Sequence, residues 1–479
     1  MITRLEIDGF KTFQTFVLDF EPFQVIVGPN AVGKSNLFDA LRLLSRLADN
    51  DLRTAFQGTE SEVASETMRG EAAELFTALP DGTATAHMRL AVELLVEPQI
   101  QDSWGARAEL KYTRLRYEIA IERRADERGL ERLYVTHERL EPIHRDSDVW
   151  IRRHLGRERT KWLPFLKAGR TQDFISTSST DGVVTISLHQ DGHGGKKLSV
   201  AERVERTVLS GVTNTEFPHV FAASEEMRKW RFLQLSPKAL RSTSPMIAPQ
   251  SISADGSYLP STLARLKAID PFILDDISRD LANLVPGVLS VEVEEDIPRN
   301  RYIVWTRMQD GRRFSSRVLS DGTLRLLALV TLKNDPEYRG VLSFEEPENG
   351  VHPFRLRNMI GVLEELATDF AQASPQEPLR QLLLNTHSPV LVSRLVKEYE
   401  DKPIPGLYFA HTITRVSPAN NGSSVRITRV VPVTSDAQSR LALGIEASEE
   451  RYSFGQVISY LETADAGEAI SYLQEHTAI

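Results

Sequence analysis

A glycine-rich loop near the N-terminus restricts the possible folds of this chain more than any other feature. The stretch GPNAVGKSN, residues 28–36, has the P-loop spacing, in which four residues separate Gly28 from Gly33-Lys34-Ser35. Average composition would produce this pattern by chance in roughly 2% of chains of this length. An apolar, β-branched run precedes the loop, and leucines at helical spacing follow it. The sequence therefore predicts a strand, a glycine loop and a helix in that order.

The residue types of this loop suit the phosphates of a nucleotide. Glycines let the backbone wrap around phosphates, and successive N–H groups at the start of a helix point toward them. Lys34 supplies positive charge, and the hydroxyl of Ser35 is a ligand for Mg²⁺. The competing interpretation is a strand-to-helix turn that happens to be rich in glycine. The predicted nucleotide contacts are Gly28, Pro29, Asn30, Ala31, Val32, Gly33, Lys34, Ser35 and Asn36.

Composition excludes several other classes of protein. The 479 residues are 41% hydrophobic, which is enough to fill the cores of two or three domains. The absence of cysteine excludes disulfides, and the eleven histidines lack zinc-site spacing. No apolar run approaches the roughly 20 residues that cross a bilayer, and no signal peptide is evident, so we expect a cytoplasmic protein without a membrane partner. The net charge of −9 disfavours a generally DNA-coating surface but is compatible with a local basic patch.

Two adjacent carboxylates end an apolar run in the second half of the chain. Residues 341–344, VLSF, lead into Glu345 and Glu346, and carboxylates at the end of a buried strand suit a Walker B site. There the first acid holds Mg²⁺, directly or through water, and the second orients or deprotonates the attacking water. Such sites usually begin with aspartate, so Glu345 leaves the metal geometry and the turnover open. An acidic loop after a core strand is the alternative interpretation.

Two more segments complete the pattern. The predicted anion contacts Leu319, Ser320, Asp321, Gly322 and Thr323 precede an apolar helix, whose free N–H groups face one point. A structural N-cap alone would explain Ser320 or Asp321. Another apolar strand, within residues 381–389, ends at His387, which can touch a γ-phosphate or position water, although a lone histidine is usually structural. The order of the four segments is far more informative than any one of them.

The order of these motifs resembles the ATPase head of the ABC class. Their sequences resemble those of the RecF-like AAA ATPases; they are GPNAVGKSN, LSDGTLR, FEEPENGVHP and NTHSP. That group is found in bacterial anti-phage defence modules and is related to the ATPase domains of the OLD family. The resemblance covers residues 1 to about 50 and about 230 to 410. It implies an α/β P-loop NTPase fold with a mixed central sheet, an antiparallel β subdomain and a helical subdomain.

The resemblance also implies hydrolysis of ATP to ADP and phosphate in a homodimer or higher oligomer. Each P-loop would hold one ATP, and the partner's Leu319–Thr323 segment would cap its γ-phosphate. Lys34 would grip the β- and γ-phosphates, and Ser35 and Glu345 would serve Mg²⁺. The implied catalytic residues are Glu346, which activates water, and His387, which contacts the γ-phosphate.

Differences from three related classes of ATPase narrow the choice of subfamily. The chain lacks the long heptads of SMC proteins, and Ser35 is separated from Leu319 by nearly three times the roughly 100 residues usual in ABC transporters. The last 90 residues contain no Asp-x-Asp, which an OLD-type Toprim nuclease domain would need for its metals, so we expect no nuclease activity. The Q-loop glutamine is either Gln57 or Gln101, and a trans-acting role for Arg53 stays open.

We expect four segments along the chain. They are the N-terminal half of the head at 1–140, an inserted basic and helical segment at 141–229, the C-terminal half at 230–410, and an extension at 411–479. Helical patterns occur near 200–210, 222–230 and 271–285.

The most basic stretch of the chain is residues 150–170, where seven Lys or Arg accompany one Glu and aromatic residues are interleaved. A solvated helical face is the plain interpretation, and contact with nucleic acid is the functional one. The candidate contacts are Arg152, Arg153, Arg157, Arg159 and Lys161.

Two functions follow from these patterns. In the first, ATP-dependent dimerisation clamps double-stranded DNA during repair or anti-phage defence. In the second, the chain is a nucleotide-gated scaffold or sensor that controls a separate effector, such as a nuclease or a toxin. The second rests on a complete ATPase head without effector chemistry of its own.

Overall fold

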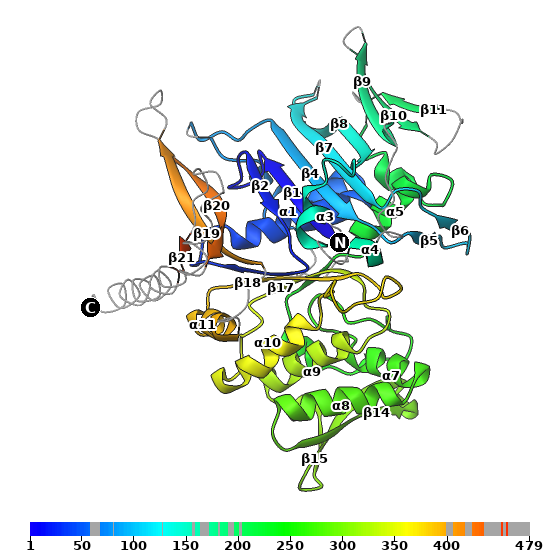
Figure 1. The fold of residues 1–479 in the computed structure, drawn as a ribbon, viewed down its shortest axis with the longest axis vertical. Coiled ribbons are helices and arrows are strands. Elements are labelled where there is room, and N and C mark those ends of the chain that lie inside the picture. Colours follow the sequence, from blue (N-terminus) through cyan, green and yellow to red (C-terminus); the bar gives the residue numbers. More distant parts are fainter. Residues whose placement is uncertain are drawn as a thin grey trace.

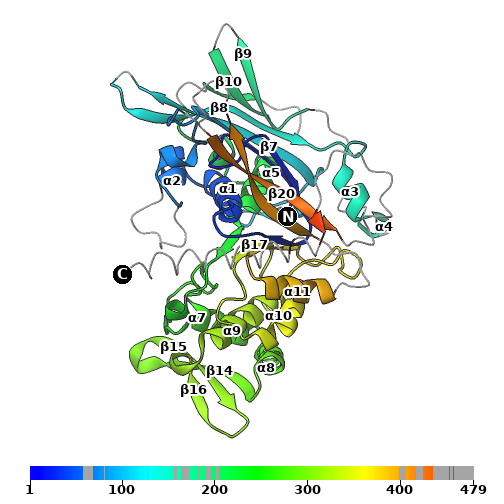
Figure 2. The same ribbon diagram turned by 90° about the vertical axis from the view of Figure 1, so that its left-hand side faces the viewer.

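The chain forms two lobes on either side of a central sheet (Figures 1 and 2). The antiparallel lobe, with the N-terminus, occupies the upper part of Figure 1, and the helical lobe occupies the lower part. The structure is a computed structural model. It describes residues 1–57, 68–79, 81–126, 128–155, 159–162, 172–180, 183–189, 196–200, 204–398, 406–416, 424–434, 452–453 and 457.

The central sheet has seven strands in the order β12-β17-β18-β3-β19-β20-β21. The neighbouring pairs from β12 to β19 are parallel, and β20 is antiparallel to β19. The strands β3 and β17 read as nearly continuous apolar runs because helices and a second sheet cover both faces. The strands are β3 (Phe23–Val27), β12 (Arg231–Leu233), β17 (Gly340–Glu345), β18 (Arg380–Thr386), β19 (Leu407–Val416), β20 (Ser424–Thr434) and β21 (Tyr452–Ser453).

An antiparallel sheet of eight strands, in the order β11-β10-β9-β8-β7-β4-β1-β2, lies above it. Its strands are β1 (Ile2–Asp8), β2 (Phe16–Asp19), β4 (His87–Leu95), β7 (Arg114–Ala125), β8 (Glu131–Pro142), β9 (Ile175–Thr180), β10 (Val183–His189) and β11 (Lys196–Val200). Apolar side chains alternate along β7, so one face packs on the core and the other meets solvent. The helices α1 (Lys34–Leu47) and α5 (Pro218–Arg228) share one apolar core with this sheet and with residues of the central sheet.

The helical lobe packs on the opposite face of the central sheet around a second core. Its helices are α6 (Pro237–Leu240), α7 (Leu259–Ile269), α8 (Phe272–Leu284), α9 (Asp321–Lys333), α10 (Leu356–Glu364) and α11 (Pro389–Glu398). A small sheet of β13 (Ser244–Pro245), β14 (Val288–Asp296), β15 (Arg301–Met308) and β16 (Arg313–Ser315) completes it. The predicted fold class, a mixed central sheet with an antiparallel subdomain and a helical subdomain, is confirmed.

The helix predicted near 200–210 is wrong. Residues 196–200 form strand β11, and only a short 3-10 helix, Leu209–Gly211, follows. The N–H groups of Val208 and Leu209 donate to the side chain of Glu138 instead of to a preceding turn. The helices predicted near 222–230 and 271–285 are confirmed as α5 and α8.

The inserted segment and the C-terminal extension both contribute strands to the two large sheets. Residues 141–229 contribute β9, β10 and β11 to the antiparallel sheet and α5 to the layer between the sheets. Residues 411–416 and 424–434 continue the central sheet through β19 and β20. The division of the chain into four segments stays a prediction.

A fully buried carboxylate holds the turn at residues 207–211. Glu138 on β8 accepts hydrogen bonds from Val208 N at 2.7 Å, Leu209 N at 2.8 Å and the hydroxyl of Tyr117 at 3.1 Å. Burial raises the pKa of Glu138 from 4.5 to about 7, against the effect of these donors. The folded protein therefore holds this proton more tightly than the unfolded chain does.

The variant Glu138→Gln tests that linkage. A raised folded pKa gives stability that is present below about pH 4.5 and is lost as the pH rises through about 7. This one group should make the free energy of unfolding of the native protein fall by about 3 kcal/mol over that window. Urea unfolding at intervals from about pH 5 to 8 should show a smaller fall in Glu138→Gln than in native protein or in the exposed control Glu131→Gln. Equal slopes in all three proteins contradict the assignment.

Candidate functional site

The P-loop joins β3 to α1 and is held from behind by β19 and β20. Gly33 has φ 96°, in the left-handed region that favours glycine. A Cβ at Gly28 would lie 2.4 Å from the carbonyl oxygen of Ala410, and one at Gly33 would lie 2.3 Å from Oγ1 of Thr428. The Thr428 hydroxyl also donates to the carbonyl of Val32 at 2.8 Å. Close packing against these strands thus requires glycine at both positions.

Lys34 begins α1, and its ammonium lies at the mouth of the loop. The side chain is 7% exposed, and Nζ donates to the carbonyls of Gly28 and Pro29, each at 2.6 Å. No side chain caps the N-terminus of α1, because the residue before it is Gly33. A positive side chain and uncapped N–H groups therefore face the same loop, an arrangement that suits an anion.

Ser35 and Glu345 meet across the sheet edge. The Ser35 hydroxyl donates to Oε2 of Glu345 at 3.4 Å, and Glu345 is the last residue of β17. A hydroxyl and a carboxylate are hard oxygen ligands of the kind that Mg²⁺ takes beside nucleotide phosphates, so these residues fit that ion. Among the described residues, no group of three or more His, Asp or Glu side chains could hold a metal. Nucleotide phosphates would therefore complete the coordination of Mg²⁺.

The two predicted catalytic residues also lie together. Oε1 of Glu346 is 3.0 Å from Nδ1 of His387, an ion-pair distance for a protonated imidazole, although the angles are not those of a hydrogen bond. Glu346 leaves the strand with φ 49°, and its N–H donates to the Asn385 carbonyl at 3.0 Å. Asn349 Nδ2 donates to the other carboxylate oxygen of Glu346 at 2.6 Å. The carboxyl ends of the parallel strands β17 and β18 bring these groups to one edge.

Two residues at this edge escaped the sequence analysis. Glu348 is half-buried, accepts a hydrogen bond from the hydroxyl of Thr386, and has a pKa raised by desolvation. Arg69 contacts Oε1 of Glu345 through Nη2. The sequence contained a signal for Glu348, because it is the third acid of the segment EEPE at residues 345–348. Arg69 had none, because it is a lone arginine 276 residues away from Glu345.

The signature segment lies at the start of α9 in the helical lobe. The Ser320 hydroxyl accepts from the N–H of Thr323 at 3.3 Å, so Ser320 is a genuine N-cap. Gly322 packs on the loop after Glu346, where an added Cβ would lie 2.4 Å from the carbonyl oxygen of Gly350. Arg241 supports the segment by donating to the carbonyl of Leu319 at 3.1 Å and pairing with Asp321.

Arg152 and Arg153 of the basic stretch are exposed to solvent, whereas Trp150 and Trp162 are not. Trp150 and Trp162 are buried and donate to the carbonyls of Phe20, at 2.6 Å, and Phe370, at 3.0 Å, so neither can stack on a base. The candidate contacts Arg152, Arg153 and Lys161 are exposed, on or near α3 (Val149–His154) and α4 (Arg159–Trp162); Arg157 and the side chain of Arg159 lie outside the described part.

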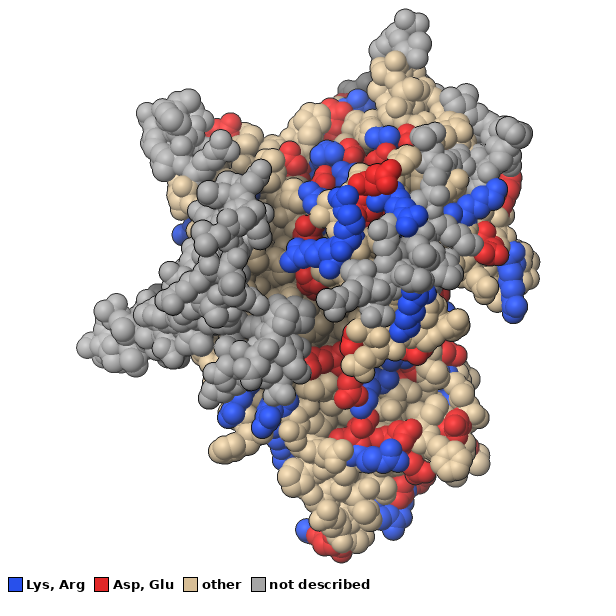
Figure 3. Space-filling view, in the orientation of Figure 1, with Lys and Arg blue, Asp and Glu red and all other residues tan. Residues whose placement is uncertain are grey.

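The remaining candidates lie on other elements. Gln57 ends α2 (Leu52–Gln57), where it lines a cavity of about 420 Å³ together with Arg53, and Gln101 lies in β5 (Gln99–Gln101). The choice between the two glutamines stays open. On the face drawn in Figure 3, Lys and Arg alternate with Asp and Glu over the antiparallel lobe. None of the described helices has the length and apolar character needed to span a bilayer.

Three solved structures of SMC heads are similar to this chain. An SMC head bound to the C-winged helix domain of ScpA is 15% identical and covers 89% of this chain and 98% of its own, with a TM-score of 0.44. The SMC head domain from Thermotoga maritima is 12% identical, with coverages of 90% and 99% and a TM-score of 0.34. A Pyrococcus furiosus SMC head domain with an extended coiled coil, bound to the C-terminal domain of ScpA, is 12% identical, with coverages of 89% and 96% and a TM-score of 0.41.

No curated protein matches the chain. A protein family does match it, over residues 23–393, from the first residue of β3 into α11. This span contains the P-loop, the signature segment, the paired carboxylates and His387, and it confirms the expected resemblance to ABC-class and RecF-like AAA ATPases. The chain belongs to the family described as AAA domain, putative AbiEii toxin, Type IV TA system.

Proposed function

We propose that this protein binds ATP with Mg²⁺ on its P-loop and hydrolyses it to ADP and phosphate. One observation carries the proposal, namely that the loop after β3 and the polar ends of β17 and β18 converge on one sheet edge. Lys34 exchanges its loop carbonyls for phosphate oxygens. Bound Mg²⁺ supplies charge that offsets the charge of the phosphates.

Glu346 is the group that takes a proton from the attacking water. Its carboxylate is about one-third exposed, at 36%, and Asn349 fixes one of its oxygens. His387, which lies 3.0 Å from the other oxygen, is the residue that we assign to the γ-phosphate and to orienting the attacking water together with Glu346. Ser35 and Glu345 would hold the metal.

The assembly that we propose is an ATP-sandwich dimer that clamps double-stranded DNA in repair or anti-phage defence. The N-terminus of α9, where Ser320 is exposed and Asp321 is half-buried, supports the sandwich as a second anion-binding element in the other lobe. Arg152, Arg153 and Lys161 support the clamp, since their side chains reach solvent. Steady-state ATP hydrolysis with and without duplex DNA tests the proposal. A rate of ATP hydrolysis that duplex DNA does not change contradicts the clamp.

The alternative is a nucleotide-gated scaffold or sensor for a separate effector. Its support is that the sequence contains the motifs of an ATPase head without effector chemistry of its own, in a family whose description names a toxin system. Co-purification with the product of a neighbouring gene, dependent on ATP and insensitive to DNA, favours this alternative. A protein that copurifies with nothing but responds to DNA contradicts it.

The DNA clamp makes a prediction about salt. Each lysine or arginine that neutralises a phosphate adds about 0.9 to the slope of log affinity against log salt. Arg152→Ala with Arg153→Ala should lower DNA affinity and reduce that slope by about 1 to 2, measured by fluorescence anisotropy from low to moderate salt. The control is Arg279→Ala, an exposed arginine on α8, 69% accessible. A slope unchanged by the double substitution removes these arginines from the interface.

A further inference from the structure

The carboxylate that we assign to the metal already has a cation beside it. Oε2 of Glu345 faces the hydroxyl of Ser35 at 3.4 Å, whereas Oε1 contacts Nη2 of Arg69. The Glu345 side chain is 16% exposed and that of Arg69 is 38% exposed, so the contact lies at the mouth of the site. Both oxygens of the acid are therefore engaged.

Arg69 also lies near a second carboxylate. Its Nε is 3.9 Å from Oδ1 of Asp39, which lies one turn after Ser35 on α1 and is almost fully buried. Lys11 connects the two, because its Nζ donates to the backbone carbonyl of Arg69 at 2.9 Å and to Oδ2 of Asp39 at 2.7 Å. Arg69 therefore lies within ion-pair distance of both carboxylates.

The local charge opposes a further cation as long as Arg69 stays at Glu345. Lys11, Arg42 and Arg69 all lie beside Asp39, and Arg69 also contacts Glu345. Burial lowers the pKa of Arg42, and Arg69 adds to that effect while Asp39 opposes it. A divalent ion placed at Glu345 meets direct repulsion from the guanidinium.

We propose that Arg69 and Mg²⁺ compete for Glu345, so that Arg69 is a built-in counter-ion which Mg²⁺ must displace toward Asp39. Arg69 is then a positioning residue that sets how much Mg²⁺ the protein needs to bind nucleotide. This inference rests on the proposed function, because it needs Mg²⁺ to bind at Ser35 and Glu345. It predicts a higher Mg²⁺ requirement than an otherwise identical site without Arg69 would show.

The test is equilibrium binding of a fluorescent ATP analogue at fixed concentration, titrated with Mg²⁺, in the full chain. Arg69→Gln removes the charge and keeps most of the side-chain volume, and it should lower the half-saturating Mg²⁺ concentration about five- to tenfold. Arg69→Lys keeps the charge and should stay within about twofold of the native protein. Arg279→Gln, on the distant α8, is the matched control and should not differ from the native protein.

Each other result has a definite meaning. An unchanged or raised Mg²⁺ requirement in Arg69→Gln, with native thermal unfolding, overturns the inference. Equal shifts in Arg69→Gln and Arg69→Lys overturn it too, because charge competition cannot then be the cause. If the native protein binds no nucleotide at any Mg²⁺ concentration, the proposed function is wrong, and the inference that rests on it is wrong as well. Nucleotide binding in the native protein thus separates the two failures.

Discussion

Replacing Glu346 with glutamine should lower kcat for ATP hydrolysis by at least about a hundredfold, because an amide cannot accept the proton of the attacking water. The side chain keeps its length and one oxygen, so the contact with Asn349 survives. Nucleotide affinity should stay within about threefold of the native value, since Glu346 does not hold the phosphates in our assignment. Phosphate release under saturating ATP, together with binding of a fluorescent analogue, measures both quantities.

Two further variants bracket this result. Lys34→Ala should lose binding itself, because it removes the ammonium now held by the carbonyls of Gly28 and Pro29. Glu337→Gln, whose side chain is 65% exposed, should behave as native. If Glu346→Gln turns over ATP at the native rate, the general base is another group, and the neighbouring carboxylate Glu348 becomes the first candidate to examine. A native protein that binds ATP without hydrolysing it removes the catalytic role of Glu346.

The parts of the site that the sequence predicted are those built from contiguous residues. The P-loop is a local structure, since Gly33 and Lys34 link one strand to one helix. Glycine and lysine at these positions are residue types that suit a phosphate. Glu345, Glu346 and His387 were also predictable, because parallel strands place their carboxyl ends at one edge. In the structure, Glu345 lies beside Ser35 and Glu346 lies beside His387.

The residues that the sequence did not predict depend on contacts across long separations. Arg69 is recognisable only beside Glu345, and no spacing rule links the two positions. The failed helix near 200–210 has the same origin, because the buried carboxylate of Glu138 takes N–H groups that a helix would have used. Trp150 and Trp162, which the sequence interleaves with basic residues, donate their indole N–H groups to the carbonyls of Phe20 and Phe370. A local sequence pattern does not show which distant residue a polar group will bind in the folded protein.

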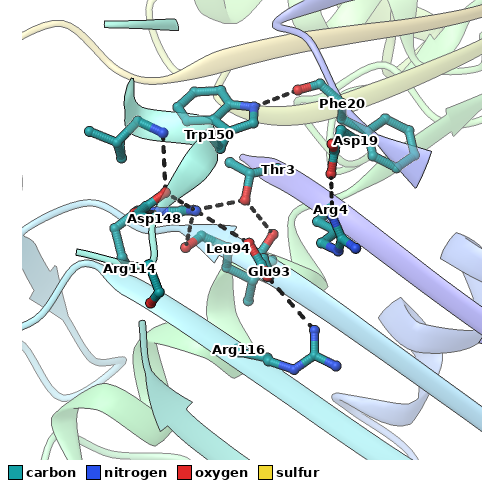
Figure 4. A network of polar contacts seen from close by, with 12 residues as sticks. Thr3, Arg4, Asp19, Phe20, Glu93, Leu94, Arg114, Arg116, Asp148 and Trp150 are labelled. Carbon is teal, nitrogen blue, oxygen red and sulfur yellow. Dashed lines mark hydrogen bonds and ion pairs between the residues drawn. The ribbon is translucent and has the colours of Figure 1, made fainter. Parts of the chain in front are cut away.

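The basic stretch depends on a buried ion pair that Figure 4 shows. Arg114 on β7 donates from Nε to Oδ2 of Asp148 at 2.7 Å and from Nη2 to Oδ1 at 3.1 Å, and both side chains are less than 5% exposed. Arg114 also donates to the hydroxyl of Thr3 at 2.8 Å. Asp148 caps α3 by accepting from the N–H of Ile151 at 3.1 Å. One carboxylate thus attaches α3 to the antiparallel sheet.

Asp148→Ala should therefore cost about 3 to 5 kcal/mol of unfolding free energy, because it removes both of its charge-assisted hydrogen bonds from a buried guanidinium, which keeps the longer carboxylate contact with Glu93 at 3.5 Å, and removes a helix cap. Arg139 and Asp173 provide the matched control, an equally two-pronged pair whose side chains are 41% and 21% exposed. Asp173→Ala should cost no more than about 1 kcal/mol, since water replaces the lost contact. Urea unfolding of both variants measures the difference. Equal losses would mean that burial of the pair does not set its contribution, and α3 would then owe its position to the packing of Trp150 rather than to charge.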